Sequence, residues 1–154
     1  MVDSELIQIV DAALAEAARK SGGWLACRPG CTQCCHGPFP ISTTDVARLH
    51  HGLAELDPAR AALIRHRAQL DQGDDDPCPV LDPDTGFCEL YDFRPLTCRT
   101  FGPAFLQNES VVGVCELCYS AATDEQIVAC AVPLDVESLD ATPEETTIAQ
   151  ALRW

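Results

Sequence analysis

The first regular pattern in the chain is helical. Between residues 2 and 20 the apolar positions recur every three or four residues, and Asp3 or Ser4 can cap the start. Gly22 and Gly23 follow directly, and glycine disfavours a continuing helix. The pattern therefore predicts one amphipathic helix that ends before these glycines.

Two more helices are predicted in the next part of the chain. Ser42 and Asp45 have the spacing of a capping box, and the apolar stripe that follows runs to about Leu56. Pro58 then stands at the first position of a third helix, which is expected to end before Gly73. These two helices should form a helical hairpin.

After these helices the pattern becomes short and extended. Residues 78–81 and 87–90 flank a segment, 82–86, with the composition of a turn. This arrangement predicts a small β-hairpin with a cysteine on each arm. The acidic run at 74–76 is expected to be a solvated linker, since it lacks the spaced ligands of a calcium site.

The rest of the chain predicts short helices. Residues 95–101 begin with a proline and should form one of them. Two pairs with capping-box spacing, Thr123 with Gln126 and Thr142 with Glu145, should open two more.

Composition and charge fit a folded protein and exclude some partners. The 154 residues are 47% hydrophobic and 22% charged, so the chain, 1–154, is expected to form a single packed domain. The formal net charge is −14, which repels nucleic acid and anionic lipid but suits a basic protein partner. No apolar run approaches the roughly 18 residues of a membrane-spanning helix.

Ten cysteines decide how the chemistry is interpreted. Asp3 and Glu5 stand where a secretory signal would be basic, so the expected location is a bacterial-type cytosol, where structural disulfides are rare. Cysteines can also be small buried hydrophobes, and Cys130, in an apolar helix, is expected to be one. The clustering of the other nine favours a metal site over a disulfide framework.

The densest cluster is the segment CRPGCTQCC, which holds Cys27, Cys31, Cys34 and Cys35. Proline and glycine bend the backbone between them, and thiolates three or four residues apart on a turn can reach one ion. Neighbouring side chains tend to diverge, so we expect that one of Cys34 and Cys35 serves a second metal or remains a free thiol.

The other candidate ligands lie further along the chain. Cys78 and Cys88 fall on the predicted hairpin arms, and Cys98 lies in the segment RPLTCRTF. A hairpin can bring such positions close to a preceding loop. Cys115 and Cys118 form a CELC pair, which is also ligand-like spacing.

These motifs carry a family resemblance. CRPGCTQCC, followed by CPVLDPDTGFCELYDFRPLTCRTFG, resembles the YkgJ-like bacterial cysteine-cluster family, described as zinc- or iron-chelating domains. The similarity covers residues 27–102, and Cys115 and Cys118 are possible additions outside it. A longer flagellin lysine methylase is similar in its cysteine region. The ligands that the resemblance implies are Cys27, Cys31, Cys34, Cys35, Cys78, Cys88 and Cys98.

Several metals suit such a donor set. Zinc, iron–sulfur clusters and copper(I) all accept cysteine-only ligation. The number of cysteines and the similarity to the methylase slightly favour an iron–sulfur cluster over zinc. Arg94 and Arg99 can offset the charge of the thiolates, or can instead form surface ion pairs with Asp92 or Glu89.

Patterns that indicate catalysis are weaker. The CxxxCxxC spacing matches radical S-adenosylmethionine enzymes, but the helical pattern that follows does not fit their barrel. His36 can orient a thiolate or act as a ligand. The rings of Tyr91, Phe93 and Phe101 are expected to pack around a metal site and shield it from water.

The expected fold class is mainly α with a small β-hairpin and irregular cysteine-rich loops organised around a metal site. We expect a cytoplasmic metal-binding protein that holds iron, as an iron–sulfur cluster, or zinc, in a structural, redox or metal-handling role. It is expected not to be an enzyme on its own. One alternative is a small iron–sulfur oxidoreductase or group-transfer enzyme with an open coordination position. The other is an interaction module in which the metal only stabilises the fold.

Overall fold

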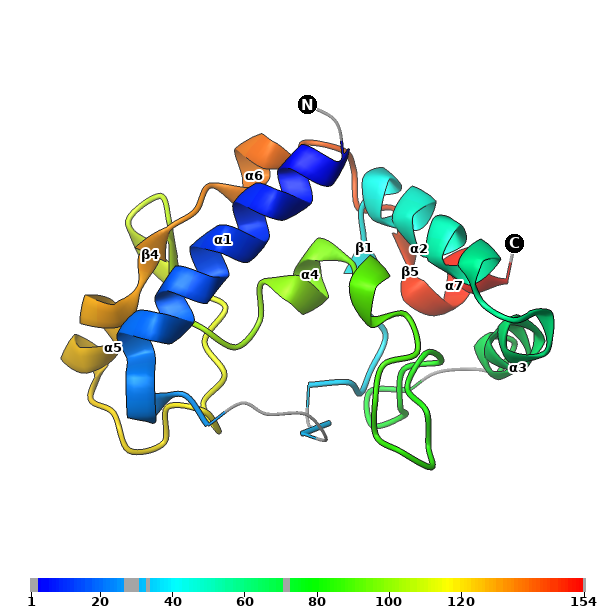
Figure 1. Cartoon of the computed structure of the whole chain (residues 1–154), viewed down its shortest axis with the longest axis horizontal. Helices are drawn as coiled ribbons and strands as arrows, with labels where there is room; N and C mark the ends of the chain where they lie inside the picture. The colour runs from blue at the N-terminus through cyan, green and yellow to red at the C-terminus, as the bar shows by residue number, and fades with distance from the viewer. Residues whose placement is uncertain (1–2, 27–30, 33, 71–72, 154) are drawn as a thin grey trace. The chain divides into compact units, whose positions relative to one another are not determined.

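Two compact units make up the chain. The computed structural model describes residues 3–26, 31–32, 34–70 and 73–153. Unit 1 combines Met1–Cys27 with Cys98–Ala141, and unit 2 combines Arg28–Thr97 with Thr142–Trp154. Each unit therefore joins segments far apart in the sequence, as the colours in Figure 1 show. The expectation of one domain stays a prediction.

Unit 1 is built on a long helix and a small sheet. Its helices are α1 (Asp3–Ser21), which runs into the 3₁₀ helix η1 (Gly22–Trp24), α5 (Asp124–Cys130) and α6 (Val136–Leu139). Its strands are β2 (Phe105–Gln107), β3 (Ser110–Val112) and β4 (Val132–Pro133). Strand β2 lies in the middle of the sheet, antiparallel to β3 and parallel to β4. Helix α1 packs against α5 and β4 (Figure 1).

Helix α1 buries one face in unit 1 and ends on a hydrogen-bond chain. The buried positions of this face are Leu6, Val10, Leu14 and Ala17. The N–H of Ala104 donates to the hydroxyl oxygen of Tyr119 at 3.1 Å, and that hydroxyl lies 2.7 Å from the hydroxyl of Ser21. Tyr119 therefore links the end of α1 to the residue that precedes β2. These two bonds also satisfy the buried hydroxyl of Tyr119.

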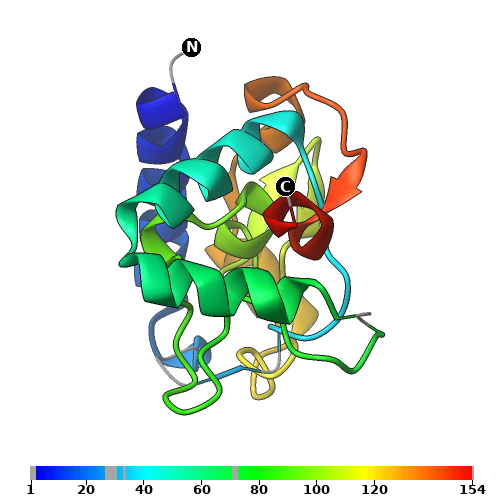
Figure 2. The same cartoon turned by 90° about the vertical axis from the view of Figure 1, so that its right-hand side faces the viewer.

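Unit 2 holds two longer helices and the C-terminal helix. Its helices are α2 (Thr43–Glu55), α3 (Pro58–Ala68), α7 (Ile148–Leu152) and the 3₁₀ helix η2 (Tyr91–Phe93), and α4 (Leu96–Arg99) has residues in both units. Strands β1 (Pro40–Ile41) and β5 (Thr146–Thr147) pair antiparallel. Helix α7 contacts both α2 and α3 (Figure 2).

A buried carboxylate joins the start of α2 to a later segment of unit 2. Asp45 accepts hydrogen bonds from the backbone N–H of Ser42 at 3.3 Å and of Leu96 at 2.9 Å, and it pairs with Arg48 at 2.5 Å. The side chains of Asp45 and Arg48 are almost fully buried. Such a buried charge is stable only with partners, so Asp45 fixes the backbone that follows Arg94.

The predicted helices are mostly confirmed. Helices α1, α2 and α3 form where the apolar pattern predicts them, α4 forms inside 95–101, and α5 begins after Thr123 with the predicted capping box. The prediction of a helix opened by Thr142 is wrong. The last helix begins after Thr147, whose side chain and Gln150 form the capping box. Residues 142–145 instead lie beside the start of α2, where the N–H of Thr43 donates to the carbonyl of Pro143.

The predicted hairpin forms as a very short antiparallel pairing. Leu81 and Cys88 form an isolated bridge, and the N–H of Asp82 donates to the carbonyl of Phe87 at 2.9 Å. Gly86 adopts a φ of 75°, which favours glycine at this turn. The mainly helical class with small sheets is confirmed, although the pattern did not predict strands β1 to β5. Within the described ranges, no helix is both long and apolar enough to cross a membrane.

Candidate metal centre

The cysteine-rich loop of unit 2 lies antiparallel to the start of the hairpin. The N–H of Cys78 donates to the carbonyl of Cys35 at 2.8 Å, and the N–H of Gly37 donates to the carbonyl of Asp76, also at 2.8 Å. Between them, His36 and Pro77 form an isolated bridge. Main-chain hydrogen bonds therefore bring the loop that carries the first cysteines to the arm that carries Cys78.

The hairpin carries Cys78 and Cys88, and the charge of Cys88 acts electrostatically on the thiol of Cys78. Each sulfur accepts a backbone N–H from the residue two positions later, Val80 for Cys78 and Leu90 for Cys88. Burial raises the pKa of Cys78 to about 12 and also raises the pKa of Cys88, and these N–H groups oppose the rise. Hydrogen bonds of this kind stabilise a thiolate, so they suit a sulfur that ligates metal.

The side chains of Cys34 and Cys35 converge. A hydrogen bond between the two side chains, together with partial desolvation of the thiol, raises the pKa of Cys34 far above its usual value, although the residue as a whole is exposed. The two thiols therefore interact, and the expectation that one of them serves a second metal or remains a free thiol stays a prediction. Cys34 is exposed, Cys35 is half-buried and Cys31 is exposed, so an ion could approach this loop from solvent.

Arg94 places a positive charge near two of these thiols. Its guanidinium lies 3.7 Å from the centre of the Tyr91 ring, and its Nε donates to the carbonyl of Tyr91 at 2.8 Å. The hydrogen bond to Cys35 raises the pKa of Cys34, and burial raises that of Cys88, while the charge of Arg94 opposes both changes. Arg94 is therefore able to offset negative charge at a thiolate site.

The other predicted arginine does not share this position. Arg99 belongs to unit 1, where its Nη1 lies 3.0 Å from both carboxylate oxygens of Asp11. The sequence missed this partner, because the two residues are far apart in the chain. Glu89, which the sequence offered as a surface partner for these arginines, pairs instead with Arg60 and Arg67 of α3.

Four of the other candidate ligands lie in unit 1. Cys98 is half-buried on α4. Cys115 and Cys118 share a tight turn, in which the N–H of Cys118 donates to the carbonyl of Cys115 at 3.0 Å. The N–H of Ala26 donates to the carbonyl of Cys118 at 3.3 Å, and Cys27 lies outside the described residues.

Cys130 is a core residue, as predicted. It is buried at the end of α5, and its sulfur lies 3.4 Å from the carbonyl oxygen of Lys20. It therefore offers an internal control for experiments on the other cysteines.

The donor chemistry of unit 2 fits a soft metal ion. Two pairs of interacting thiols, Cys34 with Cys35 and Cys78 with Cys88, lie on backbone segments joined by the bond between Cys35 and Cys78. Among the residues that the structure describes, no three His, Cys, Asp or Glu side chains are grouped tightly enough to hold a metal. The structure therefore shows thiol pairs and their supports, and it does not show a complete coordination sphere.

Some of the predicted supporting residues lie elsewhere than expected. The Nδ1 of His36 lies 3.0 Å from the carbonyl oxygen of Thr32, an arrangement that fixes the ring orientation. Phe93 packs on α2, with its ring centre 5.4 Å from that of His51. Tyr91 and Phe101 are exposed, so shielding of a metal by these two rings is not observed.

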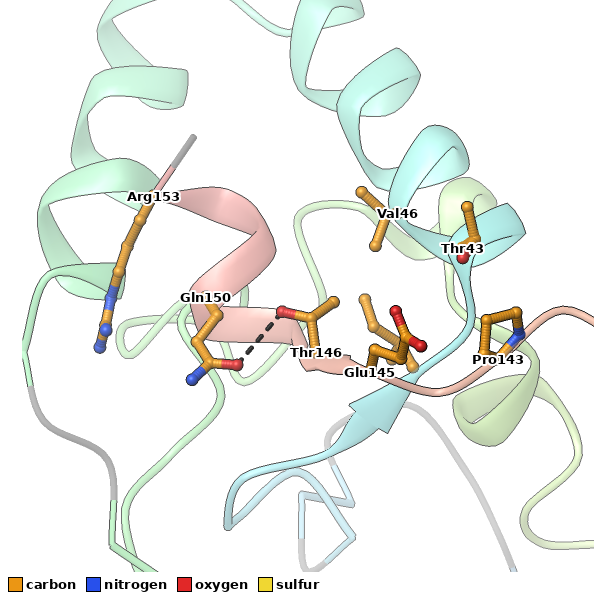
Figure 3. A pocket seen from close by; sticks show the side chains of 8 residues that line it. Thr43, Val46, Pro143, Glu145, Thr146, Gln150 and Arg153 are labelled. Carbon is orange, nitrogen blue, oxygen red and sulfur yellow. Dashed lines mark hydrogen bonds between the residues drawn. The ribbon is translucent and has the colours of Figure 1, made fainter.

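A pocket elsewhere in unit 2 contains no cysteine. It encloses about 570 Å³ between the start of α2 and the C-terminal segment. On its wall Thr146 donates to the amide oxygen of Gln150 at 3.2 Å, the bond drawn as a dashed line in Figure 3. Arg153, which also lines the pocket, donates to the carbonyl groups of Ala68 and Leu70. The pocket is therefore distinct from the thiol groups.

The sequence from 26 to 126 matches the CxxCxxCC family, described as "Putative zinc- or iron-chelating domain". The match covers more than half of the chain, and the protein belongs to this family. The predicted cysteine-cluster family is thus confirmed, and the match extends beyond Gly102 to include Cys115 and Cys118. No curated protein and no solved structure matches the chain.

Proposed function

We propose that the protein binds iron, as an iron–sulfur cluster, or zinc through clustered thiolates, and that its role is structural, redox or metal handling. Its membership of a zinc- or iron-chelating family supports metal binding in general. The observation that carries the proposal is the hairpin on which Cys78 and Cys88 interact and each accept a backbone N–H. These amides favour the thiolate form that a metal requires.

The proposed ligands in unit 2 are the five cysteines of the loop and the hairpin. Cys35 and Cys78 are linked through their backbones, which supports joint use of the two segments. In unit 1 the proposed ligands are Cys27, Cys98, Cys115 and Cys118, and the tight turn at 115–118 supports the last two. The five in unit 2 are Cys31, Cys34, Cys35, Cys78 and Cys88.

The two metals would supply different chemistry. An iron–sulfur cluster transfers electrons, whereas zinc with four thiolates is redox-inactive and holds the fold together. The number of cysteines supports the cluster slightly. Arg94 would offset the net negative charge in either case, because its charge already acts on Cys34 and Cys88.

The alternative is a small oxidoreductase or group-transfer enzyme with an open coordination position. The exposure of Cys31 and Cys34 supports it, because solvent and substrate could reach these thiols. We place metal binding first, because membership of the zinc- or iron-chelating family supports it directly. The proposed location is the cytoplasm, where the thiols would stay reduced.

Metal analysis with a visible spectrum tests this proposal on protein purified without oxygen. Iron with sulfide and absorption near roughly 400 nm indicates an iron–sulfur cluster, whereas zinc gives a colourless protein. Either result supports metal binding and selects the metal. A protein that contains neither metal, and that takes up neither when reconstituted, contradicts the proposal.

A further inference from the structure

One side chain of helix α3 binds both arms of the hairpin that carries Cys78 and Cys88. Arg67 donates from Nη1 to the carbonyl of Leu81 at 2.7 Å, and its Nη2 pairs with the carboxylate of Glu89. Leu81 closes the first arm and Glu89 directly follows Cys88 on the second. A single planar guanidinium therefore joins both arms of the hairpin to α3.

The carboxylate of Glu89 is nearly buried and is held from a second side. Arg60, two turns earlier on α3, donates from Nε to Glu89 at 2.9 Å and lies 3.5 Å from Asp82 in the turn. The side chain of Glu89 is 8% exposed, whereas that of Arg60 is 52% exposed. Arg67, at 26%, thus makes the more protected of the two ion pairs, where charged hydrogen bonds are strongest.

The geometry points to Arg67 as a positioning residue for metal binding: with Glu89, it fixes the separation of Cys78 and Cys88 before the metal arrives. The inference rests on the proposed function, because it takes these two cysteines to be ligands. Without the bridge, the hairpin has one isolated β-bridge and a few backbone bonds to hold its arms. Each thiol would then have to be ordered when the metal binds, which weakens binding.

Two further observations relate Arg67 to the thiols as well as to the hairpin backbone. Its positive charge acts on Cys78, where it opposes the effect of burial on the thiol. Its Nε is buried and, among the described residues, has no hydrogen-bond partner. A buried donor without a partner is costly. Cys78 becomes negatively charged when it loses its proton to bind metal, and a thiolate is a suitable acceptor for such a donor.

The test compares Arg67→Met with Arg65→Met in the full-length chain. Arg65 lies on the same helix, is exposed, and takes no part in the contacts of Arg67 with Leu81 and Glu89, which makes it a matched control. The readouts are the affinity of the apo-protein for Zn²⁺, measured by competition with a chromophoric chelator, and the unfolding midpoint of the apo-protein. We expect Arg67→Met to weaken Zn²⁺ binding by about 10- to 100-fold, and Arg65→Met to leave it unchanged.

Further variants separate positioning from general stability. Glu89→Gln keeps the charge of Arg67 but weakens the bridge, so it should lower the affinity for Zn²⁺ by a smaller factor. Arg67→Lys, which keeps the charge and loses the two-pronged geometry, should fall between wild type and Arg67→Met. If Arg67→Met does not fold, these two variants replace it. An equal loss of affinity in Arg65→Met, or no loss in the Arg67 and Glu89 variants, overturns the inference.

A failure of the inference can be told apart from a failure of the proposed function. Cys88→Ser serves this purpose, because it removes a proposed ligand directly. If Cys88→Ser loses Zn²⁺ while Arg67→Met and Glu89→Gln bind like wild type, the positioning role is wrong and the ligand assignment stands. If the wild-type chain binds neither Zn²⁺ nor iron, the proposed function itself is contradicted.

Discussion

The backbone N–H of Cys78 donates a 2.8 Å hydrogen bond to the carbonyl oxygen of Cys35. This bond joins the cysteine-rich loop to the hairpin through main-chain atoms alone. Because it does not use either thiol, it should persist when either side chain is changed. Substitutions of these cysteines therefore test metal ligation more than they test the local backbone.

The apo-protein should lose stability as the pH rises above about 8.5, where the thiols of the unfolded chain ionise. Burial raises the pKa of Cys78 to about 12 in the folded state, so the folded chain holds a proton that the unfolded chain releases. The free energy of unfolding should then fall by up to about 1.4 kcal/mol per pH unit for this thiol until the pH nears 12.

Urea unfolding of the apo-protein between pH 7 and 11 measures this slope. Cys78→Ala removes the titrating thiol, so its free energy of unfolding should decline less steeply with pH than that of wild type. The raised pKa of Cys88 should leave part of the slope in place. Equal slopes in the two proteins would show that folding does not raise the pKa of Cys78.

Arg94→Gln should weaken metal binding by up to about tenfold. The charge of Arg94 acts on Cys34 and Cys88, and a metal bound by several thiolates carries excess negative charge. Arg19→Gln is the control, because Arg19 is an exposed arginine of α1 that pairs with Glu16. The measurement is Zn²⁺ affinity by chelator competition, and a similar affinity in both variants would argue against a role for Arg94.

Gly52→Ala should destabilise unit 2 by about 1–3 kcal/mol through overpacking. A Cβ at this position of α2 would lie 2.5 Å from Cγ of Phe93, well inside contact distance. Gly23→Ala is the control, because a Cβ there meets nothing within 4 Å. Chemical unfolding compares the two, and Gly52→Ala combined with Phe93→Leu should recover part of the loss if the clash with the ring is its cause.

Thr147→Ala should cost about 1 kcal/mol of stability, because the side chain of Thr147 caps α7 and accepts the N–H of Gln150 at 3.2 Å. Thr142→Ala should cost less, because the hydrogen bonds of the Thr142 hydroxyl with the N–H and the hydroxyl of Thr44 are long, at 3.4 Å, and therefore weak. Urea midpoints of the two variants measure the difference. A larger loss in Thr142→Ala than in Thr147→Ala would favour the helix start at Thr142 that the sequence pattern predicted.

The helices could be predicted where the signals were local. Ser42 with Asp45 and Thr123 with Gln126 mark true helix starts, because a capping box involves only four consecutive residues. Thr142 with Glu145 has the same form and fails, since residues 142–145 are held beside α2 by long-range contacts. Strands of two or three residues, such as β1 and β5, carry too little pattern to be predicted.

In the candidate site, too, the local features could be predicted and the long-range contacts could not. Spacing alone singled out the cysteines, and the hairpin composition placed Cys78 and Cys88 on facing arms, as observed. The roles of Arg67 and Glu89 could not be predicted, because their contact joins a helix to a hairpin that follows it in the chain. The convergence of Cys34 and Cys35 depends on side-chain conformations that adjacency does not determine.

The most direct test of the central claim is the metal content per chain of three proteins purified side by side without oxygen. These are the wild type, the double variant Cys78→Ser/Cys88→Ser, and Cys130→Ser. We predict that the wild type and Cys130→Ser carry the same amount of zinc or iron, since Cys130 is a core residue, and that the double variant loses metal while keeping its helical content. A double variant that retains the full metal content of the wild type would contradict the assignment of the hairpin thiols as ligands.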